Sequence, residues 1–458
     1  MRPVASYQTV KSRPCKSEQV STFSSAKNLR ISPASQGDRF AIFQLMQRAL
    51  MKPSEADLLW QLERPGYSPA EHLICRSGQH LVGHAHLVPR KIHWGATNVD
   101  AFYVEHFVTA SEYSDLEIPQ SLFAAIDNRI ERSNASFAIT RTNHPQQFLK
   151  QGWTVLGESY VSQAPVIDLL TAFNAPVDKG PIVSLTPSKP RKISVRLWRQ
   201  VETDALRNLY ERCVEHSYGA TVRTDEHWQW LLNRRAYDRI YIAIDGGNKL
   251  ALDGDISRIL GYAVVSGTTI LEMMTVSDDR RPAEILMSRI CSDALENDQT
   301  HIQFQAEPEH ELHQILRDCQ VDSSVLSTNR GYINRNYLLV RAGDPIQYLA
   351  EMAPTLHQLA AQNLADFPCE LGLEIDGEKY CLYFEKNKIS LTDDKLGRSF
   401  LRLSSMTLMR ILLGDLDFSS AIESGQVFAS TQVATNLALK MPTKKPIWFT
   451  QWDDLANR

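Results

Sequence analysis

The sequence predicts a mixed α/β fold of the α+β class, in which one unit of strands and helices occurs twice and a different α+β domain follows. Three observations lead to this prediction. A chain of 458 residues is long enough for several domains, since domains commonly have about 150 residues. Two stretches, 29–170 and 193–342, share one order of expected elements. Beyond residue 343 that order is replaced by another.

Each repeated unit opens with a short strand and a helix. The strand "LRI" at 29–31 is followed by Asp38, an expected N-cap, and "VRL" at 195–197 is followed in the same way by Asp204. Both the strand and the N-cap of the second unit are displaced from those of the first by 166 residues. The apolar residues of each helix fall on one face, namely Phe43, Met46 and Leu50 in the first and Leu206, Leu209 and Tyr210 in the second.

A hairpin comes next in both units. Residues 72–88 read as two strands around Ser77 and Gly78, and residues 240–265 as two strands around a turn that begins at Asp245. The second strand of each hairpin contains the same kind of motif, Gly83-His84-Ala85 in one and Gly261-Tyr262-Ala263 in the other. A strand with a glutamate (Glu105 or Glu272) and then a helix follow. This shared order indicates an internal repeat.

The region 343–458 has a different pattern. "PIQYLAEMAPTLHQLA" predicts one amphipathic helix, and "CELGLEIDGEKYCLYFE" predicts a hairpin that turns at Asp376 and Gly377. Further helices are expected in "SSMTLMRILLG" and "TQVATNLALKMP"; the apolar run 408–413 would be core or line a lipid cavity. Residues 171–192 contain four prolines and read as a linker, and residues 1–28 read as a flexible tail.

The composition excludes several classes of protein. A formal charge of -4, from 49 basic and 53 acidic residues, argues against a dedicated nucleic-acid or membrane-surface protein. The 7 cysteines have no regular spacing and are expected to be reduced thiols. No apolar stretch approaches about 18 residues, and no signal peptide is evident. We therefore expect a cytoplasmic protein.

Residues 104–130, together with "NHPQQFLKQGW" at 143–153, carry a resemblance to a known family. This strand, loop and helix resemble a GNAT N-acetyltransferase domain. Two such copies followed by a small domain similar to sterol carrier protein 2 resemble the enhanced intracellular survival acetyltransferases, over about residues 29–450. The resemblance implies two GNAT-like domains, acetyl-CoA as cosubstrate without a metal, a small-molecule or peptide amine as acceptor, and a homo-oligomer of the hexamer kind.

The resemblance also implies where acetyl-CoA binds. In that family the pyrophosphate lies at the start of the helix, on a loop of the form Arg/Gln-x-x-Gly-x-Gly/Ala. The cofactor-binding positions implied here are Thr109, Ser114, Asp115, Leu116, Glu117 and Ile118. Ser114, Glu117 and Pro119 replace the basic residue and the two glycines of the pattern. A carboxylate about 4 Å from a phosphate charge costs about 4 kcal/mol at an effective dielectric constant of about 20. The loop is therefore either a weakened phosphate site or a solvated turn whose acids favour the helix dipole.

The family that the chain resembles uses a tyrosine to protonate the leaving thiolate. In the match of "FLKQGW" to its Tyr-x-x-x-Gly-aromatic pattern, Phe148 takes that position, has no proton to give and is expected to be core. We expect Asn143, His144 or an ordered water to act instead. The family's C-terminal carboxylate, which serves as a base, is expected to be displaced here by the segment "QWDDLANR".

Histidines gather in the first hairpin. His80, His84 and His86 share one face of the expected strand, with His72 and His93 nearby. A His-x-His pair can bind a metal, but no carboxylate or cysteine completes the set in the sequence. We therefore expect hydrogen-bonded strand histidines without a metal.

Two functions follow from these observations. The first is an acyl-CoA-dependent N-acyltransferase. The second is a catalytically degenerate GNAT-fold protein that binds a ligand or serves in assembly. The second repeated unit is expected to be structural in either case, and binding of acetyl-CoA distinguishes the two functions.

Overall fold

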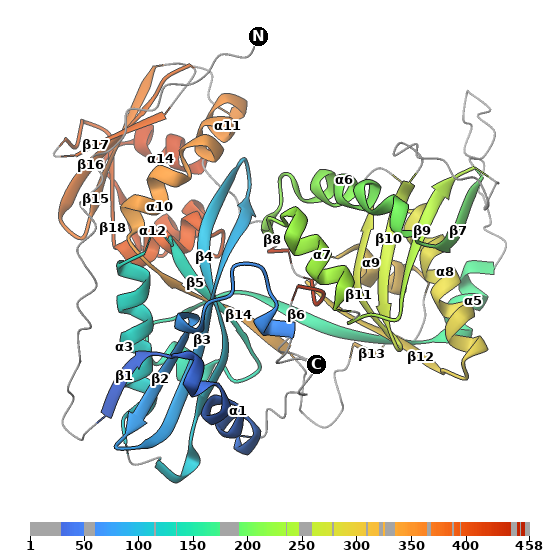
Figure 1. Ribbon diagram of the computed structural model, residues 1–458. Coiled ribbons are helices and arrows are strands. Elements are labelled where there is room, and N and C mark those ends of the chain that lie inside the picture. The colour runs from blue at the N-terminus through green and yellow to red at the C-terminus, as the bar shows by residue number, and fades with distance from the viewer. Residues whose placement is uncertain are drawn as a thin grey trace, which may run out of the picture.

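The computed structural model describes residues 29–49, 60–113, 116–133, 135–174, 192–234, 236–246, 259–276, 279–307, 310–319, 324–325, 335–363, 368–386, 389–393, 395–440, 447–448 and 450–453. Within them the protein is a mixed α/β protein, as predicted, with two α/β units and a smaller domain packed on the first (Figure 1). The expected tail, most of the expected linker and the last five residues lie outside the described residues.

The first unit alternates strands and helices as the repeat predicts. Its strands are β1 Leu29–Pro33, β2 His72–Ser77, β3 His80–Trp94, β4 Thr97–Thr109, β5 Phe137–Thr142 and β6 Thr154–Pro165. Its helices are α1 Arg39–Arg48, α3 Ile118–Glu131, α4 Gln146–Leu149 and α5 Val166–Asn174, with short 3-10 turns η1 Gln36–Asp38, η2 Pro69–Glu71 and η3 Ser111–Tyr113.

The second unit repeats this order. Its strands are β7 Ile193–Leu197, β8 Tyr218–Thr221, β9 Arg239–Asp245, β10 Ile259–Ser266, β11 Thr269–Thr275, β12 His301–Ala306, β13 Ser324–Val325 and β14 Arg335–Ala342. Its helices are η4 Gln200–Glu202, α6 Thr203–Val214, α7 Asp225–Asn233, α8 Arg281–Glu296 and α9 Glu311–Asp318. One expectation is corrected, because Glu202 rather than Asp204 precedes α6. The Glu202 carboxylate accepts from the Arg199 N–H at 2.9 Å, as Asp38 accepts from the Ser35 N–H at 2.7 Å.

The glycines of the repeated motif have a packing role. A Cβ atom on Gly83 would lie 2.6 Å from Cγ2 of Ile118 in α3. In the second unit, a Cβ atom on Gly261 would lie 2.8 Å from the Met274 carbonyl and 3.3 Å from Cδ1 of Leu286 in α8. In both units the residue must therefore be glycine, because a larger one would displace the helix or the neighbouring strand.

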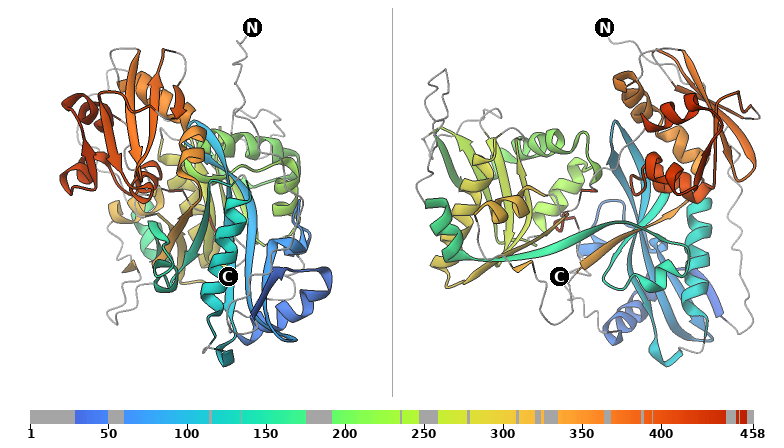
Figure 2. Two further views of the ribbon diagram at one scale, coloured as in Figure 1. Left: turned by 90° about the vertical axis from the view of Figure 1, so that its left-hand side faces the viewer. Right: turned by 180° about the vertical axis from the view of Figure 1, so that it is seen from behind.

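The two units share one sheet of 14 strands. Twelve of them follow the path β1-β2-β3-β4-β5-β14-β6-β12-β11-β10-β9-β7, while β13 pairs with β6 and β8 pairs with β3 beside it. Strand β14, the last strand of the second unit, lies between β5 and β6 of the first unit and is antiparallel to both. Strand β6 pairs with β14 from Thr154 to Tyr160 and with β12 from Tyr160 to Pro165, so it bridges the units (Figure 2). The sheet therefore exchanges strands across the predicted boundary at 171–192.

The C-terminal domain has a separate five-stranded sheet of order β17-β16-β15-β18-β19. Its strands are β15 Cys369–Ile375, β16 Glu378–Phe384, β17 Ile389–Asp393, β18 Phe400–Leu403 and β19 Val427–Ala429. Its helices are α10 Pro345–Glu351, α11 Ala353–Asn363, α12 Ser405–Leu412, α13 Phe418–Glu423 and α14 Gln432–Leu439. The predicted hairpin is confirmed, with positive φ angles of 50° at Asp376 and 94° at Gly377.

The prediction of a single helix at the start of this domain is wrong. Helix α10 ends at Glu351 and α11 begins at Ala353. Pro354 has no N–H to continue the hydrogen bonding of α10, but it is well accommodated in the first turn of α11.

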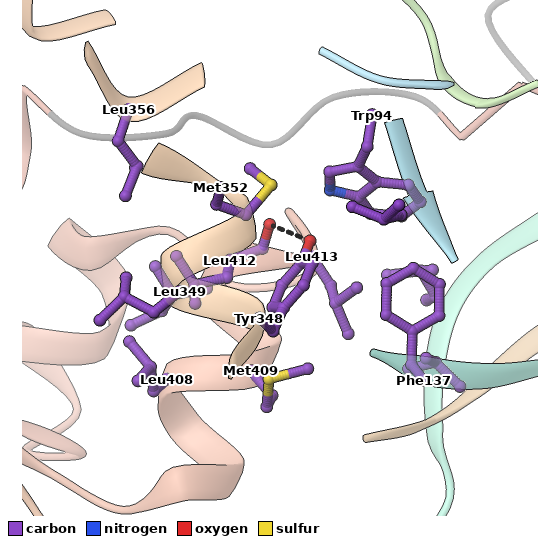
Figure 3. Close-up of a cluster of buried hydrophobic side chains, with 14 of the residues drawn as sticks. Trp94, Phe137, Tyr348, Leu349, Met352, Leu356, Leu408, Met409, Leu412 and Leu413 are labelled. Carbon is purple, nitrogen blue, oxygen red and sulfur yellow. Dashed lines mark hydrogen bonds between the residues drawn. The ribbon is translucent and has the colours of Figure 1, made fainter. Parts of the chain in front are cut away.

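Apolar side chains join the C-terminal domain to the first unit. Trp94 and Phe137 of the large sheet face Tyr348 of α10, and the rings of Phe137 and Tyr348 are 5.5 Å apart at 84° (Figure 3). The Tyr348 hydroxyl donates to the Leu412 carbonyl at 3.3 Å. Leu408, Met409, Ile411, Leu412 and Leu413 are all buried, so most of the apolar run predicted at 408–413 is core.

Two further observations concern the helices and the cysteines. Among the described helices, none combines the length and apolar character needed to cross a bilayer. Six cysteines lie in the described part of the chain, at positions 75, 213, 291, 319, 369 and 381, and no disulfide joins any two of them.

Candidate active site

Strands β4 and β5 separate at one point, and this opening defines the candidate site. Their parallel pairing covers only Ala101–Tyr103 of β4, opposite Phe137–Ile139 of β5. One residue later, the Thr140 hydroxyl donates to the Val104 carbonyl at 2.8 Å. Both strands continue without further pairing between them in the described structure. The edge of β4 beyond Val104 can therefore offer backbone groups to an extended ligand.

A bulge in β4 follows directly. The pairing with β3 passes from Glu105 opposite His86 to Val108 opposite His84, so β4 has one residue more than β3 at this place. His106, inside the bulge, has a φ angle of 45°, which residues other than glycine rarely adopt. Glu105 and His106 therefore both contact His86, whereas neighbours on a regular strand point to opposite faces.

Four buried histidines form the histidine cluster, which comprises His72, His84, His86 and His106. Nδ1 of His72 and Nε2 of His84 lie 2.8 Å apart and share a hydrogen bond. The rings of His72 and His86 are stacked, with centroids 4.0 Å apart and planes inclined by 6°. Nε2 of His106 lies 2.9 Å from Nε2 of Gln61.

Two carboxylates flank the histidine cluster. Glu71 lies 3.3 Å from Nε2 of His86, pairs with Arg64 and accepts from the Ser68 N–H at 3.2 Å. Glu105 lies 3.6 Å from Nδ1 of His86 and accepts from Nη2 of Arg90 at 2.8 Å. His86 thus lies between two carboxylates, each of which is paired with an arginine.

Burial and charge set the protonation of this site. Burial lowers the pKa of His72 and His84, and the neighbouring histidines lower it further, so both rings are neutral at neutral pH. Burial acts to raise the pKa of Glu105, but the Arg90 guanidinium and then His86 outweigh burial and hold the pKa below its usual value. Glu105 is therefore ionised at neutral pH, the form that accepts a proton.

The implied acetyl-CoA positions lie at the end of β4 and the start of α3. Thr109 and Leu116 are half-buried, and Ile118 is buried as the first residue of α3. Glu117 is exposed at the N-cap position of α3, and its side chain makes no capping hydrogen bond. Ser114 and Asp115 lie outside the described residues.

The expected acid residues lie on the loop that follows β5. Asn143 and His144 are exposed between β5 and α4, where the His144 N–H donates to the Thr142 hydroxyl at 2.9 Å. Phe148 is buried, as expected of a core residue. Its ring lies 5.1 to 5.4 Å from the rings of Phe123, Trp153 and Phe107.

The structure corrects the set of histidines suggested by the sequence. His80 is exposed, and His93 lies beside Glu211 instead, 3.6 Å from its carboxylate. The sequence does not predict that His106 joins the histidine cluster, because the bulge changes the alternation of side chains along β4. The carboxylates that accompany the histidine cluster come from η2 and β4, whose proximity is not readable from spacing. In the described part of the chain, no group of three or more His, Cys, Asp or Glu side chains has an arrangement that could hold a metal ion.

The second unit has the same opening, but a C-terminal segment fills it. Strands β11 and β12 pair only at Thr269–Ile270, opposite Gln303–Phe304. The next carbonyl, of Leu271, accepts from the Thr450 hydroxyl at 3.2 Å and from the Gln451 N–H at 3.3 Å. Leu271 corresponds to Val104 of the first unit, because each residue directly follows the last pair of the two parallel strands. In the second unit the C-terminal segment therefore occupies the opening between the strands.

A buried ion cluster holds that segment. Arg223 bonds both oxygens of Glu272, at 3.0 and 2.5 Å, and both oxygens of Asp453, at 3.0 Å each. Glu272 lies two residues beyond the last β11–β12 pair, as Glu105 does beyond the last β4–β5 pair. The Asp453 carbonyl accepts from Arg90 at 3.3 Å, which connects the segment to the first unit. The glutamate of the second unit is therefore engaged by an arginine of its own unit.

A comparison of the sequence with protein-family models finds a match over the region that contains the opening between β4 and β5. The family model described as "Acetyltransferase (GNAT) domain" matches residues 30–156. Over these residues the first unit is therefore similar to a GNAT domain. Its match begins in β1 and ends in β6, and it includes the opening between β4 and β5. No curated protein sequence matches the chain.

Solved structures with this fold extend the likeness beyond residues 30–156. A GCN5-related N-acetyltransferase from Anabaena variabilis ATCC 29413 has a TM-score of 0.65 and 14% identity, with 92% of this chain and 98% of that chain covered. One from Kribbella flavida has a TM-score of 0.61 and 14% identity, with 92% and 97% covered. Eis1 from Mycobacterium abscessus has a TM-score of 0.55 and 14% identity, with 92% and 99% covered. At these identities the likeness establishes the fold.

Proposed function

We propose that the GNAT domain transfers an acyl group from an acyl-CoA, with acetyl-CoA as the donor, to an amine. The observation that carries the proposal is the position of Glu105, whose ionised carboxylate lies at the bulge just beyond the point where β4 and β5 separate. A GNAT match over the same residues supports the assignment to acyl transfer. The reaction is proposed for the first unit, because the C-terminal segment already occupies the corresponding opening of the second unit.

Glu105 is the proposed general base. The attacking amine must lose a proton as its nitrogen bonds to the acyl carbon, and an ionised carboxylate beside the opening can accept that proton. Arg90 keeps Glu105 ionised and fixes one of its oxygens. The carbon–sulfur bond of the donor breaks in the same transfer, and the CoA thiolate leaves.

The leaving thiolate needs a proton that Phe148 does not have. Asn143 and His144 lie on the loop that follows β5, and they or an ordered water remain the proposed source. Both side chains are exposed, so solvent can reach this loop. We expect catalysis without a tyrosine to be slow, since general acid catalysis contributes a factor of about 100 or more.

A second candidate is a GNAT-fold protein that binds a ligand without turnover. Two observations favour it, namely the exposed carboxylate of Glu117 at the N-terminus of α3 and the buried Phe148 at the expected tyrosine position. In that case the fold would bind acyl-CoA weakly, or bind another ligand, and would release no CoA.

The test is release of CoA thiol from acetyl-CoA in the presence of a panel of primary amines. We expect slow turnover by the wild type and a loss of about 100-fold or more in Glu105→Gln. Glu112→Gln changes an exposed acid of the nearby η3 turn and should keep full activity. Binding of acetyl-CoA without CoA release would support the second candidate instead.

The remaining expectations concern the whole chain. The five-stranded sheet and helices of the C-terminal domain support our proposal that this domain is similar to sterol carrier protein 2. We also propose a cytoplasmic homo-oligomer that acts on a small-molecule or peptide amine, without nucleic acid or membrane partners. Sedimentation of the full chain would test the oligomer.

A further inference from the structure

Arg90 of β3 connects the proposed base to the C-terminal segment, residues 450–453. Its Nη2 atom donates to Oε1 of Glu105 at 2.8 Å and to the backbone carbonyl of Asp453 at 3.3 Å. The Arg90 side chain is only 8% exposed, and its guanidinium carbon lies 4.3 Å from the centre of the Tyr103 ring. One buried cation therefore contacts both the base of the first unit and a residue 363 positions further along the chain.

The second unit fixes the position of Asp453. Arg223 bonds both oxygens of the Asp453 carboxylate at 3.0 Å, and Nε2 of His227 lies 3.1 Å from one of them. The preceding backbone carbonyl accepts from Arg234. These three partners lie in α7 or directly beside it. The carbonyl that meets Arg90 is thus held from the second unit.

We propose that Asp453 is a positioning residue for acyl transfer, because its carbonyl holds Arg90 against Glu105. The inference rests on the proposed function, in which Glu105 is the general base, and adds a contribution of the second unit to the reaction. The opening of that unit is filled, and the segment that fills it is the one that reaches Arg90.

A second anchor on Arg90 matters because the arginine side chain is long and flexible. A guanidinium that is bonded only to Glu105 would sample several rotamers, whereas a contact with a fixed carbonyl restricts it to one position. Burial acts to raise the pKa of Glu105, and the Arg90 guanidinium is the first of the charges that oppose burial. If Arg90 moves away, the carboxylate loses part of this stabilisation and binds a proton at higher pH.

Other charged and titratable groups surround Arg90 and Glu105. After burial and Arg90, the groups that act on the pKa of Glu105 are His86, His106 and Arg64, and all three lower it. They belong to the first unit, so loss of the Asp453 contact should raise this pKa only in part. The remaining groups are Glu71 beside His86, Tyr103 of β4, Arg141 of β5, and Arg223 and His227 of the second unit.

The variant Asp453→Ala tests the proposal, because it removes the carboxylate that fixes the segment to Arg223. Titration of Glu105 is measured by carbon-13 NMR on protein labelled at the glutamate side-chain carboxyl carbon, and Glu105→Gln identifies the signal by its loss. We expect the midpoint of Glu105 to rise by about 1 pH unit. The acid limb of kcat/KM against pH, for CoA release with acetyl-CoA and amine, should move by the same amount, while the plateau above it is retained.

The matched control is Glu272→Gln. Glu272 is the other buried carboxylate that bonds Arg223, at 3.0 and 2.5 Å. Both variants leave the Arg223 guanidinium with one carboxylate and should lower the melting temperature, but Asp453 stays bound in the control. Glu272→Gln should therefore keep the wild-type titration of Glu105 and the wild-type acid limb. Asp453→Asn keeps one oxygen for Arg223; it replaces the alanine variant if the latter does not fold, and should shift both readouts in the same direction.

A second variant acts on the other side of the contact. Arg90→Lys keeps the charge but loses the planar guanidinium that rests on Tyr103 and reaches both oxygens. It should raise the midpoint of Glu105, and the further change Asp453→Ala should then add little, because both substitutions interrupt one contact. Fully additive shifts would overturn the proposal.

The outcomes separate this inference from the proposed function. An unchanged titration of Glu105 in the folded Asp453 variant, or equal shifts in Asp453→Ala and Glu272→Gln, would overturn the positioning role. Wild-type turnover in either case would leave acyl transfer intact. A shifted titration in Asp453→Ala alone, together with no turnover by the wild type, would overturn acyl transfer and retain the hold of Asp453 on Arg90.

Discussion

Arg223 and Asp453 are 230 residues apart in sequence, yet they form a two-point ion pair that is fully buried. Both hydrogen bonds of the pair measure 3.0 Å. Trp452, the neighbour of Asp453, is also buried, and its ring lies 5.5 Å from that of Trp228. The C-terminal segment is therefore an integral part of the second unit.

The first prediction concerns this pair. Asp453→Asn should destabilise the protein by about 3 kcal/mol, because a buried arginine then loses one of two charged partners. Urea unfolding at pH 7 measures the change. Asp318→Asn is the control, since Asp318 and Arg280 form an exposed pair at 2.6 Å and should contribute less than about 1 kcal/mol. Equal losses in the two variants would contradict the prediction.

The second prediction concerns acid. Burial, followed by neighbouring histidines, lowers the pKa of His72, of His84 and of His310, the last to about 4. Below about pH 6.5 the unfolded chain therefore binds more protons than the folded chain at these sites. The free energy of unfolding should be fully retained above pH 6.5 and fall below it, by up to about 1.4 kcal/mol per pH unit for each histidine.

Urea unfolding at pH 7.5 and pH 5.5 measures this slope. His310→Asn should reduce the loss by up to about 1.4 kcal/mol, because one titrating group is removed. Asparagine can still accept from the Leu312 N–H at the start of α9, as Nδ1 of His310 does at 3.1 Å. A stability independent of pH over this range would refute the assignment of neutral buried rings.

The third prediction concerns the glycine under α3. Gly83→Ala should destabilise the protein by about 1–3 kcal/mol, because its Cβ would lie 2.6 Å from Ile118 and 3.1 Å from Leu122. The shift of α3 should also weaken acetyl-CoA binding. Gly157→Ala is the control, since its Cβ would meet nothing within 4 Å. Unchanged unfolding of Gly83→Ala would show that α3 adjusts freely.

The fourth prediction concerns the loop before α3. Acetyl-CoA should bind the wild type with a Kd in the millimolar range, equivalent to about 4 kcal/mol. Replacement of Ser114 by Arg and of both Glu117 and Pro119 by Gly should tighten binding, because positive charge and close backbone approach return together. Calorimetric titration at low salt measures both proteins. Glu131→Gln, at the other end of α3, should change nothing, and micromolar binding by the wild type would refute the weakened site.

The sequence was a good guide to elements and a poor guide to long-range pairing. Helix α1 and both hairpins follow from local pattern and turn residues, because their hydrogen bonds join neighbouring segments. Strand β1 follows from its own pattern, but its pairing with the distant strand β2 does not. The repeated glycines, Gly83 and Gly261, were visible as a motif, and only the structure explains them as places where a helix crosses a strand. Pro354 is a sequence signal for the break between α10 and α11, but the apolar periodicity of the segment favours one continuous helix.

The candidate site was less predictable. Phe148 was correctly expected to be core, since its position follows a local motif. Glu71, His86 and Glu105 meet only because strands β3 and β4 and the 3-10 turn η2 converge, and His106 joins them only because β4 contains a bulge. Neither the convergence of these elements nor the bulge produces a regular spacing of residues in the sequence. The docking of Asp453 on Arg223 likewise depends on tertiary structure alone.

The placement of β14 has a consequence for biosynthesis. The first unit emerges from the ribosome early, but the strand that lies between β5 and β6 spans Arg335–Ala342 and is synthesised only after the rest of the second unit. Until then the nascent chain exposes two strand edges that have no partner, the kind of surface that promotes mispairing between chains. Native closure of the first unit therefore has to wait for the second unit, so the two units of this protein are expected to mature together rather than one after the other.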